Sequence, residues 1–563
     1  MRPAESPDAF SSLTLRGPLV ALADMSPKSR FISRFFFLTC SAILLQAGCR
    51  TNPKSSTAVT APTELRLASI FSHNMVLQQG ASVPVWGWAD DGEIITVQFA
   101  DQKVTTTAKG GKWMARLNNL KYGAPGTLTV SGSKTLVFTN VVVGEVWVCS
   151  GQSNMEFALR NSYQSTNDIA ISANPNLRLF TVQKLKANAP TNNVRGSWAE
   201  AGPTTTPGFS AVAYYFGRDL QKALGVPVGL IHTSWGGSPA EAWMSEQVLA
   251  GNPRYKTEIL DAYVKQSENF QKNLAQFEKE QAEAKAANKP FTRNRPNPGW
   301  KPSELYNGMI APIISYGIKG AIWYQGESNA GKAEQYRSLF ADMIRNWRRD
   351  WAQGGFTFLT VQLAPYMKIK PEPAESTWAE LREAQNLTIK TLPKAGTVSI
   401  TDVGEENDIH PKKKEPVGVR LALAARGITY GHKIVYSGPT YKSVEFENGS
   451  ARISFDHVGT GLETHGLAGQ TNWMGWNTVT GDLTKETYLL KGFSIAGADR
   501  KFVWADAQIV GDQVVVSSAA VSDPVAVRFG WADYPVVNLW NKDGIPATPF
   551  RTDNFPMITA PKK

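Results

Sequence analysis

The chain has 563 residues, of which 42% are hydrophobic and 19% charged, so we expect a globular protein with several domains rather than one core. The net charge is +11, but Lys and Arg are spread along the chain without a nucleic-acid-binding motif, which excludes a nucleic acid as the expected partner. Three cysteines and no Cys/His cluster of metal-ligand spacing argue against a disulfide framework and a metal site, and we expect no metal or organic cofactor.

Residues 1–48 have the pattern of a secretory signal peptide, with Met25 as a possible true start. Basic residues precede the apolar run Phe35–Leu45, and two small residues precede Cys49. The stretch that ends at Cys49 resembles a bacterial lipobox, so Cys49 is the predicted lipidation site and residues 49–64 the tether. A plain cleaved signal is the alternative. We therefore expect an exported protein, periplasmic or held at the outer membrane by a lipid anchor alone.

Residues 65–140 contain short alternating runs separated by turns, such as Ile94–Phe99 and Lys112–Leu117. This spacing predicts an N-terminal β-sandwich. Residues 436–550 return to the same kind of pattern, which predicts a second, C-terminal β region, followed by a tail at 551–563.

Residues 141–435 alternate helical periods with apolar strands, which is typical of an α/β domain with a parallel sheet. Within it, residues 252–302 are charged and then Pro-rich, which predicts a helical insertion that is either a solvated excursion or a lid. The predicted strands are Val141–Val148, Gly225–Ile231, a run near 318–324, Phe356–Leu363 and Val398–Thr401.

The strand that ends at Val148 leads directly into Ser-Gly-Gln-Ser-Asn-Met, with a helix expected to start near Asn154–Glu156. A serine on such a tight turn has an exposed hydroxyl, and nearby backbone N–H groups can stabilise a developing negative charge. Ser153 is therefore the candidate nucleophile. The alternative is that Ser153 is only the N-cap of the helix.

Three further strand ends carry polar groups, and in a parallel sheet all of these ends meet at one edge. The pattern favours acyl transfer, in which His410 takes the serine proton and Asp408 orients the imidazole. An oxyanion needs about two or three hydrogen-bond donors. The candidates are the N–H of Ser153, an N–H of Gly236 or Gly237, and a side-chain amide of Gln325 or Asn329.

Four blocks resemble the sialate O-acetylesterase family of the SGNH hydrolases, in the family's order. They are Gly-Gln-Ser-Asn-Met, Ser-Trp-Gly-Gly-Ser, Trp-Tyr-Gln-Gly-Glu-Ser-Asn and Asp-Ile-His-Pro. The flanks His73–Gln79 and Pro549–Asp553 are also similar, so the resemblance spans roughly residues 65–555. It implies a flavodoxin-like, three-layer α/β/α esterase core with N-terminal and C-terminal β-sandwich-like regions, with Ser153 as nucleophile and His410 as base.

The resemblance implies a serine esterase that removes O-acetyl groups from carbohydrates, above all from O-acetylated sialic acids, through an acetyl-Ser153 intermediate. One alternative is an esterase for acetylated xylan or another plant polysaccharide, and another is an inert surface protein that binds carbohydrate. Many SGNH enzymes have the acid three residues before the histidine, where this chain has Asn407. Asp402 or a Ser–His dyad therefore remain alternatives to Asp408. Gln325 is preferred to Asn329 as the amide donor because it lies closer to the strand end.

Overall fold

The computed structural model describes residues 64–465 and 489–561. The predicted signal peptide and the predicted lipidation site Cys49 lie outside these residues. Over the described ranges, no helix combines the length and the apolar character that crossing a membrane would require.

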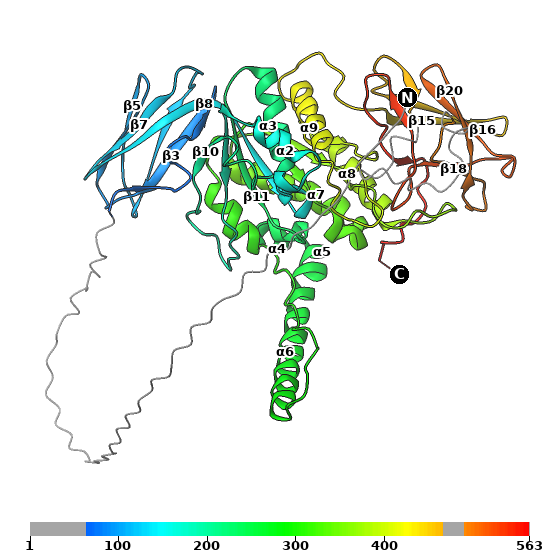
Figure 1. Cartoon of the computed structure of the whole chain (residues 1–563), viewed down its shortest axis with the longest axis horizontal. Helices are drawn as coiled ribbons and strands as arrows, with labels where there is room; N and C mark the ends of the chain where they lie inside the picture. Colours follow the sequence, from blue (N-terminus) through cyan, green and yellow to red (C-terminus); the bar gives the residue numbers. More distant parts are fainter. Residues whose placement is uncertain (1–63, 466–488, 562–563) are drawn as a thin grey trace, which may run out of the picture. The chain divides into compact units, whose positions relative to one another are not determined.

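A largely parallel sheet forms the centre of the fold (Figure 1). Its strands β11, β8, β12, β13 and β14 lie in the flavodoxin-like order 2-1-3-4-5, which confirms the predicted fold class. β9 extends the sheet in parallel beyond β11, and β10 pairs with β9 in the antiparallel direction. The bounds are β8 Thr135–Gly151, β9 Asn174–Thr181, β10 Trp198–Ala201, β11 Val228–Ser234, β12 Gly320–Tyr324, β13 Thr357–Val361 and β14 Ala395–Val398.

Successive side chains of each strand point to opposite faces of the sheet. Both faces are apolar here, and helices cover both. In β8, Trp147 and Cys149 pack into the hydrophobic core shared with α3 and α9. The neighbouring Val146 and Val148 pack into the core shared with α7 and α8. The result is the predicted three-layer arrangement. The helices are α3 Ala211–Leu224, α7 Ala333–Trp351, α8 Thr377–Thr391 and α9 Glu415–Ile428.

Two parts of the core differ from the sequence prediction. The predicted strand Val398–Thr401 is wrong in position, because the last paired residue of β14 is Val398. Directly after this strand, the carbonyl oxygen of Ser399 accepts a hydrogen bond from Arg420 of α9 at 3.1 Å, and no strand pairing among the described residues includes Ser399. No helix is predicted at α8, because the buried face of this helix includes polar side chains that interrupt the apolar period. These are Glu380, Arg382 and Gln385.

β8 links the N-terminal strands to the central sheet. Its first half pairs with β7 in the antiparallel direction, and its second half lies between β11 and β12. β7 continues through β4 to β5, and β1, β3 and β6 form a separate three-stranded sheet. The bounds are β1 Arg66–Leu67, β2 Val76–Gln78, β3 Ser82–Trp88, β4 Ile94–Phe99, β5 Gln102–Thr107, β6 Lys112–Asn118 and β7 Gly126–Ser131.

In the described residues after α9, the strands form two four-stranded antiparallel sheets around a common hydrophobic core, with orders β15-β16-β21-β20 and β19-β18-β22-β24, and a two-stranded sheet of β17 Leu462–Thr464 and β23 Leu539–Asn541. The domain limits given by the sequence stay predictions. The bounds are β15 Thr440–Glu447, β16 Ser450–Asp456, β18 Phe493–Ala496, β19 Val503–Trp504, β20 Asp506–Val510, β21 Gln513–Ser517, β22 Ala526–Phe529 and β24 Phe550–Arg551.

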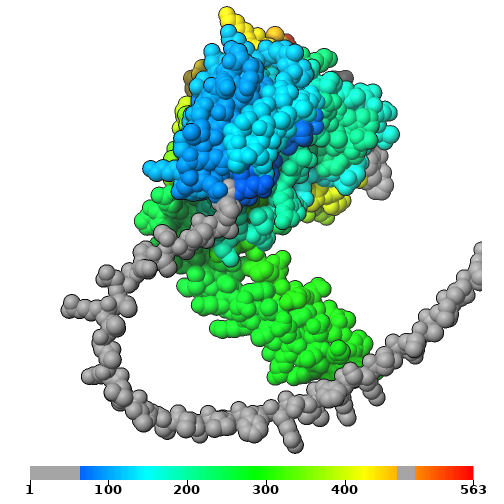
Figure 2. Space-filling view, turned by 90° about the vertical axis from the view of Figure 1, so that its left-hand side faces the viewer, coloured from blue at the N-terminus to red at the C-terminus, as the bar shows by residue number. Residues whose placement is uncertain are grey.

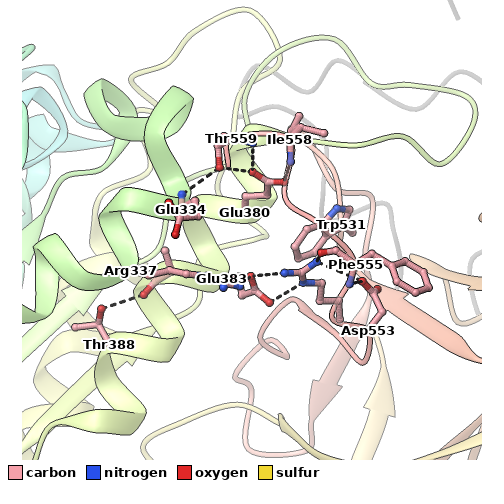
Figure 3. Close-up of polar contacts among 12 residues, drawn as sticks. Glu334, Arg337, Glu380, Glu383, Thr388, Trp531, Asp553, Phe555, Ile558 and Thr559 are labelled. Atoms are coloured by element: carbon pink, nitrogen blue, oxygen red, sulfur yellow. Dashed lines mark hydrogen bonds and ion pairs between the residues drawn. The ribbon is translucent and has the colours of Figure 1, made fainter. Parts of the chain in front are cut away.

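The last described residues are held against α7 and α8 by buried polar contacts (Figure 3). Arg551 binds both carboxylate oxygens of Glu383, at 2.7 and 3.1 Å. The backbone N–H groups of Ile558 and Thr559 donate to the buried carboxylate of Glu380. Because buried charges are stable only when they are paired, these contacts fix the chain end to the helical layer.

The insertion at 252–302 contains the long helix α6, Ala262–Ala286, and a chain that runs back beside it (Figure 1). Figure 2 shows the pair as one solid green projection. Phe277 and Phe291 stack edge to face with ring centroids 5.2 Å apart, and Arg293 pairs with Glu280. The predicted helix is therefore present, and the irregular chain that runs back beside it reaches Gly237 at Trp300, whose Nε1 would lie 3.9 Å from a Cβ built on that glycine.

Candidate active site

Ser153 is the first residue of the short helix α1, Ser153–Glu156, directly after β8. The N-cap position belongs to Gln152, so the alternative that Ser153 caps this helix is wrong. The turn requires glycine at 151, where φ is +140° and a Cβ would collide with the carbonyl oxygen of Tyr324. The first N–H groups of a helix have no acceptor within the helix, so the N–H of Ser153 is available to an oxyanion.

Gly236, which follows β11, lies next to Ser153, the candidate nucleophile. A Cβ built on Gly236 would be 3.2 Å from the Cβ of Ser153. The N–H of Gly236 donates to Glu156 Oε2 at 2.7 Å, and Glu156 Oε1 accepts from Lys184 at 2.6 Å. Gly237 follows in the left-handed region with φ +75° and is exposed. The structure thus brings Gly236 of the predicted pair to Ser153, with its N–H bound to a carboxylate, whereas a Cβ built on Gly237 would lie near Trp300 instead.

The loop that carries His410 is bonded to the nucleophile helix. Asn154 Nδ2 donates to the carbonyl oxygen of Ile409 at 3.0 Å, so the residues that follow Ser153 and precede His410 are in direct contact. The same Nδ2 donates to Glu327 Oε1 at 2.6 Å. Three of the four predicted blocks therefore meet at the side chain of Asn154.

Asp408 and Asp402, the two predicted acids, lie in different surroundings. Asp408 Oδ1 accepts the backbone N–H of His410 at 2.9 Å and lies 3.6 Å from His410 Nδ1. Asp402 is bound by both terminal nitrogens of Arg420, at 2.6 and 2.8 Å. Asp408 therefore has the position of an orienting carboxylate, close to the imidazole nitrogen that such a carboxylate binds, and Asp402 serves an ion pair with α9.

Gln325 and Asn329 are both buried and hydrogen-bonded to protein groups. Gln325 Nε2 donates to Asn329 Oδ1 at 2.7 Å and to the carbonyl oxygen of Ser238 at 3.3 Å. Asn329 Nδ2 donates to Glu241 Oε2 at 2.9 Å. Gln325 would have to break one of these bonds to donate to an oxyanion, whereas Asn329 would have to turn its second amide hydrogen toward the site. In this arrangement the two amides connect the end of β12 to the loop after β11.

Lys414 and Glu327, which are not among the predicted site residues, are opposite charges that both hydrogen-bond to Asn154. Lys414 is 1% exposed, and its ammonium donates to Asn154 Oδ1 while it lies 4.8 Å from the ring centroid of Phe157. Burial lowers the pKa of Lys414 to about 7 against the opposing charge of Glu327. Burial raises the pKa of Glu327, and hydrogen bonds and Lys414 oppose that shift.

His410 is half-buried, and its surroundings favour the neutral base. Burial lowers its pKa below the usual range, the positive charge of Lys414 lowers it further, and the charges of Asp408 and Glu156 oppose both. A general base must be unprotonated to accept a proton. The lowered pKa therefore keeps the His410 imidazole neutral, as the predicted base must be, down to mildly acidic pH.

An aromatic pair lies at the edge of this site. Trp235, directly before Gly236, packs edge to face against Trp300 with ring centroids 5.5 Å apart, and both indoles are partly exposed. Lys184 lies 5.2 Å from the ring centroid of Trp235, and Lys186 lies 4.0 Å from that of Trp300. Lysines over indole rings are held by cation–π attraction. Partly exposed indoles beside a nucleophile offer flat apolar surfaces to a sugar ring.

The arrangement is that of a serine esterase of the SGNH class, in which the nucleophile follows the first strand of a flavodoxin-like sheet and the histidine comes from a loop late in the domain. The family model described as "Carbohydrate esterase, sialic acid-specific acetylesterase" matches residues 143–286 and 294–426, and the chain belongs to this family. It is a carboxylic ester hydrolase that acts on carbohydrate O-acetyl groups.

Curated relatives support the same assignment. The chain is 31% identical to a sialate O-acetylesterase of Rattus norvegicus over 68% of this chain and 76% of that protein. It is 27% identical to a sialate O-acetylesterase of Mus musculus over 84% of this chain and 90% of that protein. Among solved structures, a carbohydrate acetylesterase from Xanthomonas citri is similar, with 36% identity, a TM-score of 0.73, and coverage of 88% of this chain and 100% of that one.

The two acids can be separated by matched substitutions. We expect Asp408→Asn to lower kcat by about 10²-fold or more, because the imidazolium loses its nearest carboxylate. Asp402→Asn removes an ion pair instead, so it should lower the melting temperature and leave kcat within a few-fold. Steady-state hydrolysis of an aryl acetate and thermal unfolding measure both effects. A collapse of kcat in Asp402→Asn with near-normal Asp408→Asn would reverse the assignment.

Proposed function

We propose that this protein removes O-acetyl groups from sialic acids through an acetyl-Ser153 intermediate, with His410 as the base. The observation that carries the proposal is the hydrogen bond from Asn154 to the carbonyl oxygen of Ile409, which joins the nucleophile turn to the histidine loop. Further support comes from the rat and mouse relatives, which are named sialate O-acetylesterases.

The proposed reaction has two half-reactions. In the first, Ser153 Oγ attacks the acetyl carbonyl as His410 accepts the hydroxyl proton, and the backbone N–H of Ser153 stabilises the oxyanion. The C–O bond to the sugar then breaks, and His410 returns the proton to the departing sugar hydroxyl. In the second, His410 takes a proton from water, the water attacks the acetyl-enzyme, and acetate leaves as Ser153 regains its proton.

The nearest rival is an esterase for acetylated plant polysaccharide. A sialic acid carries a carboxylate, and the lysines near Ser153 are already paired: Lys184 with Glu156 at 2.6 Å and Lys186 with Glu304 at 2.9 Å. A neutral pyranose needs no free cation and can stack on Trp235 or Trp300. These observations favour keeping acetylated xylo-oligosaccharide as a second candidate substrate.

Acetate release from O-acetylated sialic acid and from acetylated xylo-oligosaccharide, measured in parallel, separates the two substrates. We expect the higher kcat/KM on the sialic acid ester. Ser153→Ala should abolish release from both substrates and leave the melting temperature within a few degrees of wild type, since a partly exposed hydroxyl is lost. Faster hydrolysis of the xylo-oligosaccharide would instead indicate deacetylation of plant glycans. No acetate release from either ester, with an intact fold, would favour the carbohydrate-binding alternative.

We also propose that the protein is exported and anchored in a bacterial membrane by lipid on Cys49, with no role for nucleic acid. The support is the lipobox-like stretch and the polar tether that follows it.

Expression of the full chain in a bacterial host with labelled palmitate tests the anchor. We expect the wild-type protein to carry the label and to sediment with membranes. Cys49→Ala should lose the label and keep the esterase activity, because Cys49 lies far from the catalytic blocks in sequence. An unlabelled, soluble wild-type protein would instead identify residues 1–48 as a plain cleaved signal.

A further inference from the structure

Asn154, Glu327 and Lys414 form a polar cluster next to Ser153. All three side chains come from different segments of the chain: the nucleophile helix, the turn after β12 and the loop before α9. Asn154 and Lys414 are each 1% exposed, so solvent water does not supply hydrogen bonds to their polar groups. Buried polar groups of this kind are stabilised by the hydrogen bonds that they make to one another.

The amide of Asn154 lies between a buried cation and a buried anion. Its oxygen accepts a hydrogen bond from the Lys414 ammonium, and its nitrogen donates to Glu327 Oε1 at 2.6 Å. The ammonium therefore faces the negative end of the amide and the carboxylate faces the positive end. This alignment fixes the orientation of the amide, because a flipped amide would turn its NH₂ group toward the ammonium and its oxygen toward the carboxylate.

The fixed amide has a second consequence for the histidine loop. With its oxygen held by Lys414, Nδ2 of Asn154 is directed at both Glu327 and the carbonyl oxygen of Ile409. Ile409 directly precedes His410, so this hydrogen bond restricts the backbone position from which the His410 side chain extends. The Lys414 ammonium also lies 4.8 Å from the ring centroid of Phe157 and 5.4 Å from that of Tyr324, which favours one position for the cation.

We propose that Lys414 is a positioning residue of the esterase, which orients Asn154 and thereby holds the backbone at Ile409, directly before His410, against the turn that carries Ser153. The proposal rests on the proposed function of Ser153 and His410. Lys414 takes no part in bond making or breaking, and its effect reaches the reaction through Asn154.

The charge of Lys414 gives the proposal a signature that a purely structural role lacks. The charged groups that act on His410 are Lys414, Asp408 and Glu156, and of these Lys414 alone is positive. Removal of this positive charge makes protonation of His410 easier. The acidic limb of the kcat/KM profile, where His410 loses its proton, should therefore move to higher pH.

Lys414→Met tests the proposal, since methionine keeps much of the length and removes the charge and the donor. We expect kcat on an aryl acetate to fall about 10-fold or more, because a small misplacement of a base is costly. KM should stay within about two-fold. The acidic limb should rise by about 0.5 to 1 pH unit. Lys413→Met is the matched control, because Lys413 is the exposed neighbour in the same loop and should leave all three quantities unchanged.

A second variant controls for loss of activity through unfolding, because Lys414→Met leaves the carboxylate of Glu327 without a nearby cation. The double variant Lys414→Met/Glu327→Gln removes both charges and keeps an oxygen acceptor for Asn154. We expect it to fold and to show the same upward shift of the acidic limb. Wild-type kcat and an unmoved limb in either folded variant would overturn the role of Lys414. The role of Ser153 would stand as long as the wild-type activity is lost in Ser153→Ala.

Discussion

The close approach of two backbones at the end of β8 is the constraint on which the catalytic edge depends. Gly151 leaves no room for a side chain against Tyr324, and the N–H of Gln152 then donates to the carbonyl oxygen of Tyr324 at 3.0 Å. The side chain of Gln152 adds to this link, because its Oε1 accepts the N–H groups of Gly326 and Ser328 at 3.4 and 3.3 Å. The turn that carries Ser153 is therefore bound to the end of β12 by contacts that involve none of the proposed reacting side chains.

Burial of charge beneath this turn explains why the histidine loop has a defined place. The side chains of His410 and Asp408 are 37% and 44% exposed, so their 3.6 Å separation alone provides a weak anchor in water. The contact of Asn154 with Lys414 is buried, and its contacts with Glu327 and Ile409 are partly buried, where hydrogen bonds between charged and polar groups are stronger than in water. The loop that carries the base is thus held from beneath rather than from the solvent side.

The sequence predicted the parts of the fold that follow from local pattern. The apolar runs at β8, β11 and β12 and the polar residues after them identified the edge where Ser153, Gly236 and His410 lie. The pattern failed where buried side chains are polar. α8 has Arg382 on its buried face, so its period does not look amphipathic.

The roles of Asn154 and Lys414 could not be read from the sequence for a related reason. Lys414 belongs to a run of three lysines, a composition that usually indicates a solvated surface, and its burial depends on the packing of Phe157 and Tyr324 around it. Nor does a Gly-Gly pair reveal that the N–H of Gly236 is bound by Glu156. A signal was present only in the position of Asn154, directly after the nucleophile.

Transfer of the acetyl group to Ser153 is the central claim, and trapping the acetyl-enzyme tests it most directly. An aryl acetate has a good leaving group, so the acyl-enzyme forms quickly and accumulates before water removes it. We would mix enzyme and aryl acetate, quench with acid within the first turnovers, and locate the added acetyl group by peptide mass spectrometry. The prediction is one acetyl group on the peptide that carries Ser153, and none in Ser153→Ala. An acetyl group on a different residue, or rapid acetate release with Ser153 never acetylated, would contradict the proposed mechanism.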